Sequence, residues 1–152
     1  VLVEIEYSVQ TFESLTKEDL YNLLRFRQEV FVVEQSSAYL DADGIDLIGF
    51  QIIGKSNGDI VSTARIFKKE YNGRQIAYLG RFALSSDFRG RHYGKELLEL
   101  AIELCREKYP GLEMGGTAQV ALLGYYSQFG FEPEGEEFDD GGIPHRMVIK
   151  ND

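Results

Sequence analysis

The sequence predicts an α/β fold, a mixed sheet with helices on its faces, because helical and strand patterns alternate along the chain. A period-3.6 apolar pattern that begins at Gly94 follows a long strand-like run from Gln75 to Leu84. Asn-Gly pairs at 57–58 and 72–73 join strand-like runs, a strong signal for hairpins. With 152 residues, of which 43% are hydrophobic, the chain has enough length and apolar content for one core. We therefore expect a single domain over residues 1–152.

The N-terminal half predicts a strand, a helix and a hairpin. Thr16 is a suitable cap for a helix that we expect to run to about Gln35, with acidic residues in its first turn. An acidic loop over residues 41–46 follows; we expect it, together with Glu137, Asp139 and Asp140, to be solvated, or else to attract a cationic amine. The expected strands are Leu2 to Tyr7 at or near a sheet edge, Leu47 to Lys55, and Ile60 to Phe67.

The C-terminal half predicts the long strand, the best helix and three further strands. Gly80 inside the long strand indicates a bulge or a close backbone approach. Pro110-Gly111 ends the helix, and the unit from Gln75 to Thr117 is expected to be a right-handed parallel crossover. The remaining elements are a strand from Leu112 to Thr117, a short helix from Ala118 to Gln128, and two strands around a turn at 139–142.

Composition excludes several classes of function. A formal net charge of −9 opposes binding to nucleic acids or anionic membranes, which depends on a basic surface. No apolar run approaches the roughly 20 residues of a membrane span, and the first residues do not resemble a signal peptide. We therefore expect a cytoplasmic protein. The single cysteine, Cys105, lies in an apolar helical pattern and is expected to be a core residue.

A basic turn, residues 85–95, joins the long strand to the best helix. Arg89, Arg91 and Lys95 lie within seven residues of a chain that is otherwise acidic. The first N–H groups of a helix lack partners and carry the positive end of the helix dipole, so such a turn suits an anion. The glycine spacing fits neither the dinucleotide-binding nor the nucleoside-triphosphate fingerprint. The alternative is an ordinary turn with unrelated positive charges.

This turn resembles the cofactor loop of the GNAT superfamily of N-acetyltransferases: Arg or Gln, two residues, Gly, one residue, then Gly or Ala. Arg89 and Gly94 match, whereas His92 replaces the first motif glycine. A side chain there disfavours positive φ, so we expect the anion to shift or His92 to donate a hydrogen bond. A second family signature, Tyr, three residues, Gly and an aromatic residue, is matched from Tyr126 to Phe131.

The resemblance implies a mixed, mostly antiparallel central sheet with helices on both faces, acetyl-CoA as co-substrate, and no metal. It assigns to Tyr126 the protonation of the departing thiolate; the alternative is aromatic packing. Tyr125 is expected to be core or a substrate wall. The residues implied to bind the cofactor are Phe82, Ala83 and Leu84 through their backbone, then Arg89, Gly90, Arg91, His92, Tyr93, Gly94, Lys95 and Tyr126.

At both ends the chain is similar to the ElaA-like branch of this superfamily, through residues 25–35 and 140–145, where Gly142 looks like an insertion. Four polar residues in otherwise apolar segments are candidates for the acceptor pocket, with structural roles as the alternative. They are Arg27, Glu34, Gln35 and His145. The general base is left open among Glu29, Glu34 and His145.

The predicted activity is direct transfer of acetyl from CoA to an amine of a small molecule or peptide. Two alternatives remain. One is an acyl-homoserine-lactone-synthase-like acyltransferase, whose relatives carry a similar Arg-Phe helix and a loop like residues 41–46. The other is a non-catalytic sensor of acetyl-CoA. The oligomeric state is open, with a homodimer among the alternatives.

Overall fold

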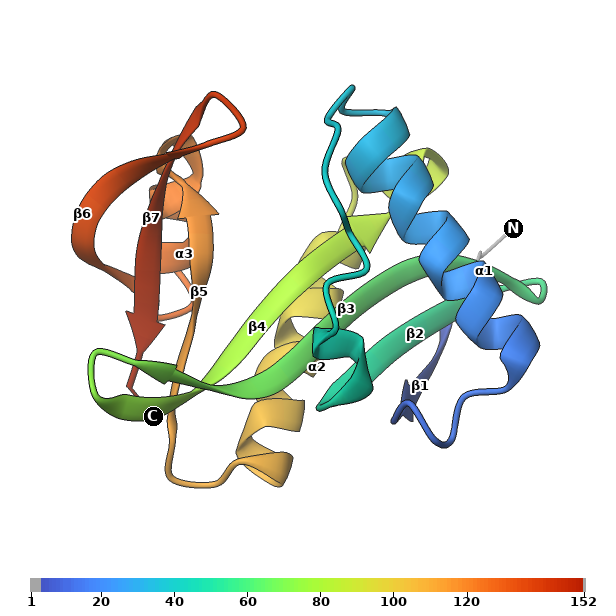
Figure 1. Ribbon diagram of the computed structural model, residues 1–152, viewed down its shortest axis with the longest axis horizontal. Coiled ribbons are helices and arrows are strands. Elements are labelled where there is room, and N and C mark those ends of the chain that lie inside the picture. Colours follow the sequence, from blue (N-terminus) through green and yellow to red (C-terminus); the bar gives the residue numbers. More distant parts are fainter. Residues whose placement is uncertain (1–3, 152) are drawn as a thin grey trace.

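The computed structural model describes residues 4–151, which form a seven-stranded mixed sheet with three α-helices (Figure 1). The strands are β1 (Glu6–Gln10), β2 (Phe50–Ser56), β3 (Asp59–Tyr71), β4 (Arg74–Leu84), β5 (Glu113–Gln119), β6 (Glu132–Asp140) and β7 (Ile143–Lys150). The helices are α1 (Lys17–Gln28), α2 (Tyr93–Lys108) and α3 (Leu123–Ser127).

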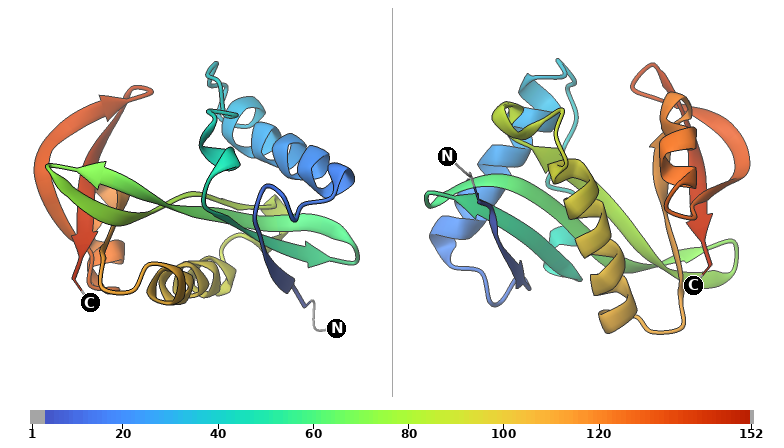
Figure 2. Two further views of the ribbon diagram at one scale, coloured as in Figure 1. Left: turned by 60° about the horizontal axis from the view of Figure 1, so that its bottom comes forward. Right: turned by 180° about the vertical axis from the view of Figure 1, so that it is seen from behind.

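The sheet has the strand order β1-β2-β3-β4-β5-β7-β6. Over the described residues, β4 and β5 pair in parallel and all other neighbours are antiparallel. Helix α1 covers one face of the sheet and α2 the other (Figure 2). The predicted mixed, mostly antiparallel sheet with helices on both faces is confirmed, as are the parallel pairing that follows α2 and the edge position of β1.

The Asn-Gly pairs form the predicted hairpin turns. Asn57 and Gly58 have φ of 52° and 85°, and Asn72 and Gly73 have φ of 49° and 77°. Two successive positive φ values are what the common two-residue hairpin turn requires, and Asn and Gly adopt them with the least strain.

Several predicted boundaries are wrong. The helix capped by Thr16 ends its α-helical part at Gln28 and continues as a π-helical turn over Glu29–Val33. The strand expected from Leu47 begins at Phe50, because Gly49 turns the chain at φ +80°. The residues from Ala118 do not start a helix, since β5 keeps its pairing with β7 to Gln119. The first strand begins at Glu6, and Leu2 and Val3 lie outside the described residues.

The main core lies between the sheet and α2. The apolar stripe of α2, which includes Leu97, Ala101, Leu104 and Cys105, packs against central strand residues such as Ile66. Cys105 is 1% exposed, and burial raises the pKa of its thiol to about 12. The expected core role of this cysteine is confirmed, because a neutral, buried thiol is unreactive.

Beneath α1 the sheet carries charges instead of a purely apolar core. We call this set, which comprises Arg27, Asp41, Asp43, Asp46, Arg65 and Arg81, the charge network. Arg27 Nε lies 2.9 Å from Asp41 Oδ2, and its Nη1 lies 2.6 Å from Asp46 Oδ1. Arg65 of β3 binds Asp43 at 2.6 Å and Asp46 at 3.0 Å. The expectation that the acidic loop is solvated is therefore wrong: arginines of α1, β3 and β4 neutralise it.

The charge network makes stability depend on acidic pH. Burial by itself would raise the pKa of Asp43, but the Arg65 guanidinium outweighs it and lowers the pKa to about 2. The pKa of Asp46 is lowered in the same way by Arg27 and Arg65. A carboxyl group whose folded pKa lies below its unfolded value of about 4 stabilises the fold above that value and loses the contribution as pH falls toward 2.

We therefore expect the melting temperature to fall between about pH 4 and pH 2, with a smaller fall for Asp43→Asn. Calorimetric melts at a series of pH values measure this. A melting temperature that is equal at pH 5 and pH 2.5 would contradict the assignment.

Candidate active site

A cleft opens where β4 and β5 separate. The two strands pair only from Ile76 to Tyr78 with Glu113 to Gly115. Beyond this point β4 continues beside β3 and β5 continues beside β7, so the strands diverge as a V (Figure 1). The N-terminus of α2 lies next to the end of β4, and α3 follows the end of β5. The topology thus exposes one backbone edge of β4 inside the molecule.

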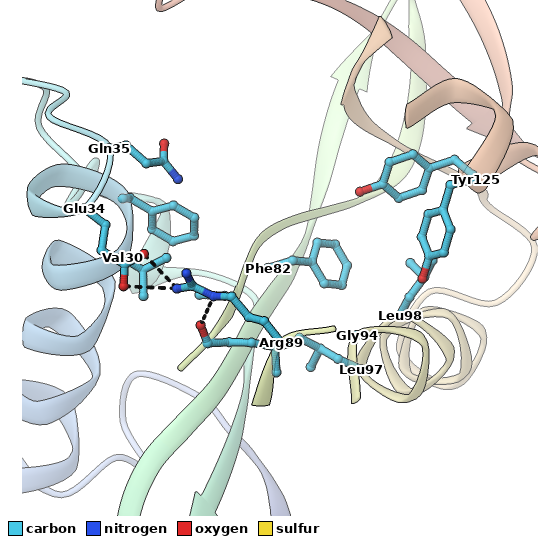
Figure 3. A pocket seen from close by; sticks show the side chains of 13 residues that line it. Val30, Glu34, Gln35, Phe82, Arg89, Gly94, Leu97, Leu98 and Tyr125 are labelled. Carbon is cyan, nitrogen blue, oxygen red and sulfur yellow. Dashed lines mark hydrogen bonds and ion pairs between the residues drawn. The ribbon is translucent and has the colours of Figure 1, made fainter. Parts of the chain in front are cut away.

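The cleft holds a pocket of about 460 Å³. Side chains from the π-helical turn and from the two residues after it form one wall, Tyr125 of α3 lies on the opposite side, and Phe82 of β4 lies between them (Figure 3). Tyr126, the next residue of α3, also lines the pocket. The lining residues are Val30, Phe31, Glu34, Gln35, Phe82, Ala83, Leu84, Arg89, Gly94, Leu97, Leu98, Tyr125 and Tyr126. The structure therefore brings nine of the residues singled out from sequence into one mostly apolar space.

The end of β4 presents peptide groups to this pocket. Ser85 donates its N–H to Val61 O at 2.7 Å, toward β3, whereas Leu84 O points the other way and accepts from Arg89 Nε at 2.9 Å. Because peptide groups alternate in direction along an antiparallel strand, the N–H groups of Phe82 and Leu84 also face away from β3. This edge is suited to pair with an extended ligand as an added strand would.

The basic turn presents Gly94 to the pocket at the start of α2. A Cβ at Gly94 would lie 3.7 Å from Leu84 Cδ1, on the lining surface. His92 is the N-cap of α2 with φ −71°, and its side chain gives the helix no capping hydrogen bond. The imidazole is 69% exposed and lies near Glu96. A side chain at position 92 therefore costs no backbone strain, and the N-terminal peptide groups of α2 remain suitable for an anion.

The remaining predicted residues of the turn lie around the pocket and not in its lining. Tyr93 is buried and packs edge-on against Phe88, with ring centroids 5.2 Å apart. His92 and Lys95 line a separate groove along α2, and Gly90 and Arg91 are exposed.

Arg89 is held by Glu34 across the pocket. Its Nη2 lies 2.8 Å from Oε2 and 3.1 Å from Oε1 of Glu34 (Figure 3). The pair joins the residue that ends the π-helical turn to the basic turn, and each side chain is about two-fifths exposed. Among the lining residues these are the one cation and the one carboxylate, so each is the other's partner in an otherwise uncharged site.

Tyr126 is half-buried between the core and the pocket. Its ring packs edge-on against Tyr125 at 5.3 Å and against Phe131 at 6.5 Å. Burial, and to a smaller extent Tyr125, raises the pKa of Tyr126 above its ordinary value. The phenol therefore carries its proton at neutral pH and is able to donate it. Tyr125 is 40% exposed and forms part of the pocket wall.

Two residues predicted for the acceptor pocket lie elsewhere. Arg27 is 1% exposed and is fully engaged in the charge network. His145 stacks on Phe138, and its Nδ1 lies 2.8 Å from Ile143 O. Polar residues in apolar segments indicate either a site or a buried ion pair, and the structure gives the second role to Arg27. Neither Arg27 nor His145 lines the pocket, whereas Glu34 and Gln35 do.

Four lining residues were not predicted. Val30, Leu97 and Leu98 follow the same apolar period as the core, so nothing in their pattern separates a pocket wall from a buried face. Phe31 is half-buried on the π-helical turn, which the sequence did not indicate.

Residues 4–151 include no group of three or more His, Cys, Asp or Glu side chains arranged to hold a metal ion. In the same part of the chain, no helix is long and apolar enough to cross a membrane.

Comparison with known proteins gives one family. Residues 15–131 match the acetyltransferase (GNAT) family. The chain is 36% identical to Protein ElaA of Escherichia coli over 143 residues, 93% of each chain. The crystal structure of E. coli ElaA superposes with a TM-score of 0.89 and covers 97% of this chain and 100% of the other.

Two further solved structures share the fold. An acyl-CoA N-acyltransferase from Pseudomonas aeruginosa is 29% identical, with a TM-score of 0.91 over 97% of this chain and 100% of the other. The acyl-homoserine-lactone synthase LasI is 17% identical, with a TM-score of 0.72 over 97% of this chain and 89% of the other, a likeness of fold alone.

Proposed function

Because the chain belongs to the acetyltransferase (GNAT) family, we propose that it is an acetyl-CoA-dependent N-acetyltransferase. One observation carries the proposal: a single pocket joins the open edge of β4, the start of α2 and the hydroxyl-bearing Tyr126. These are the parts needed to hold a thioester, an anion and a leaving thiolate.

The proposed cofactor position follows from the shape and chemistry of the pocket. The pantetheine arm would pair with the backbone edge from Phe82 to Leu84, as an added strand pairs with a sheet. Its pyrophosphate would lie at the start of α2, where Gly94 leaves room and the helix dipole favours negative charge. Arg89 adds a cation at the same end.

In the proposed reaction a neutral acceptor amine attacks the acetyl carbonyl directly, so a C–N bond forms as the C–S bond breaks. An N–H of the Phe82–Leu84 edge stabilises the oxyanion. Tyr126 gives its proton to the departing thiolate sulfur, and the amine loses its extra proton to a base or to solvent. Of the three candidates for that base, Glu34 alone lines the pocket.

In this proposal Glu34 competes with the cofactor for Arg89. Removing its charge is therefore expected to change CoA affinity and turnover in opposite directions. Glu34→Gln is expected to tighten CoA binding about two- to fivefold, because the exposed ion pair that occupies Arg89 is weakened. The same change is expected to lower turnover, since the pocket loses its carboxylate. Calorimetric titration with CoA and acetyl-transfer kinetics measure the two effects.

The matched control is Glu29→Gln, one turn earlier, where the carboxylate pairs with Arg25 outside the pocket. This variant is expected to leave both values unchanged. Weaker CoA binding by Glu34→Gln would contradict the competition.

The proposed function is tested by thiol release from acetyl-CoA with arylamines, polyamines, amino sugars and peptide amines as acceptors. Release that depends on one class of amine, with the acetylated product found by mass spectrometry, is expected. A lactone formed from an acyl carrier protein donor would favour the lactone-synthase alternative. CoA binding without transfer to any acceptor would favour a sensor.

A further inference from the structure

Arg81, in the middle of β4, has a backbone conformation that is unusual for its residue type. Its φ is +53°, in the left-handed region that side chains other than glycine disfavour. The other non-glycine residues with positive φ in the described chain, Ser36, Asn57 and Asn72, lie in turns. A strained residue inside a strand persists only where its surroundings hold it.

The strained residue forms a β-bulge directly before the proposed cofactor edge. Thr63 of β3 pairs with Ala83, but Arg65, two residues further along β3, pairs with Gly80, three residues back along β4. One extra residue is thus inserted into β4 between these pairs. A bulge bends its strand and redirects the residues beside it. Here those residues are Phe82, Ala83 and Leu84, which face the pocket.

The side chain of Arg81 is held from several directions by the charge network. Its Nε lies 2.8 Å from Asp41 Oδ1 as an ion pair, although the N–H is not aligned for a hydrogen bond. Its Nη2 lies 3.3 Å from Asp43 Oδ2. The guanidinium also lies 5.9 Å from the ring centroid of Phe31 and 5.6 Å from that of Tyr39.

The partners of Arg81 are themselves fixed. Asp41 is 4% exposed and accepts a hydrogen bond from Arg27 of α1, and Asp43 forms an ion pair with Arg65 of β3. A series of ion pairs therefore connects α1 and the neighbouring strand β3 to the guanidinium of Arg81 at the bulge. These ion pairs offset the backbone cost of the left-handed residue.

We propose that Arg81 is a positioning residue: its ion pairs with Asp41 and Asp43 hold the β4 bulge, and the bulge directs the Phe82–Leu84 edge toward acetyl-CoA. This inference rests on the proposed function, since it assigns that edge to the cofactor. Position 81 has two separable properties, a left-handed backbone and a side chain held by ion pairs. Different substitutions at this position affect them differently.

The test compares Arg81→Ala with Arg81→Gly by calorimetric titration with CoA. Both variants lose the same ion pairs, but alanine also disfavours φ +53° whereas glycine adopts it freely. We expect Arg81→Ala to weaken CoA binding about tenfold and Arg81→Gly to stay within about threefold of the unchanged chain. Arg81→Lys, which keeps a cation near Asp41, is expected to bind nearly as well as the unchanged chain.

Thermal melts separate this role from a general effect on folding. Both the alanine and the glycine variants are expected to melt at lower temperature, yet only alanine should lose CoA affinity in the folded state. Equal affinities of the two variants, or an Arg81→Gly variant that does not fold, would overturn the inference. An unchanged chain that binds no CoA would overturn the proposed function, and this inference with it.

Discussion

Replacing Tyr126 with phenylalanine is expected to lower turnover about 100-fold or more at saturating acceptor, with little change in CoA affinity. The substitution removes the hydroxyl proposed to protonate the thiolate and keeps the ring that packs against Tyr125 and Phe131. Since the pKa of Tyr126 is raised by burial, the lost group is a phenol that is protonated over the whole neutral range. Steady-state kinetics with the acceptor found in the amine screen measure the effect.

Tyr125→Phe is the matched control. Tyr125 is the adjacent residue on the same short helix, lines the same pocket and is not assigned a proton transfer. Its variant is expected to keep turnover within about threefold of the unchanged chain, since an exposed hydroxyl away from the reacting atoms contributes little. Unchanged turnover of Tyr126→Phe would remove Tyr126 from the mechanism, and equal losses in both variants would indicate a general role of the aromatic wall.

Arg27→Met is expected to lower the free energy of unfolding by about 3–5 kcal/mol. The methionine fills much of the space of the arginine stem but leaves Asp41, which is 4% exposed, without its main cation and removes a 2.6 Å partner from Asp46. Breaking one side of a buried ion pair costs more than the pair contributes, because the remaining charge stays desolvated. Urea unfolding followed by circular dichroism measures the change.

Arg25→Met, two residues earlier on α1, is the control. Its side chain is 67% exposed and pairs with Glu29 in solvent, so a loss below about 1 kcal/mol is expected. A loss for Arg27→Met that is no larger than this would contradict the description of the charge network as a buried, mutually dependent set.

The hairpins and α2 were predictable because local chemistry determines them. Asn-Gly at 57–58 and 72–73 adopts its positive φ values almost independently of context, and the apolar stripe of α2 follows one period from Leu97 to Cys105. The π-helical turn at Glu29–Val33 was not predictable in this way. Its apolar residues fit a continued α-helix equally well, so the sequence pattern does not distinguish a π-helical turn from an α-helix.

The part of the proposed site that consists of motif residues was predictable, because the predicted strand-helix-strand unit places them near one another. Tyr126 lies more than 30 residues after Arg89 and Gly94 in the sequence, but the parallel β4-α2-β5 unit brings the three to one pocket. Arg27 was misplaced because an arginine among apolar residues has the same sequence signal whether it binds a ligand or a buried carboxylate. The partners of Arg27, at Asp41 and Asp46, are 14 and 19 residues away, and only the fold pairs them.

The central claim is that the cleft between β4 and β5 binds acetyl-CoA through the end of β4 and the start of α2. Titration of ¹⁵N-labelled protein with CoA tests it most directly, because each backbone amide reports on its own surroundings. We predict the largest shifts at residues 82–84 and 89–95, with a further shift at Tyr126. No saturable shifts, or shifts confined to residues outside these segments, would contradict the claim.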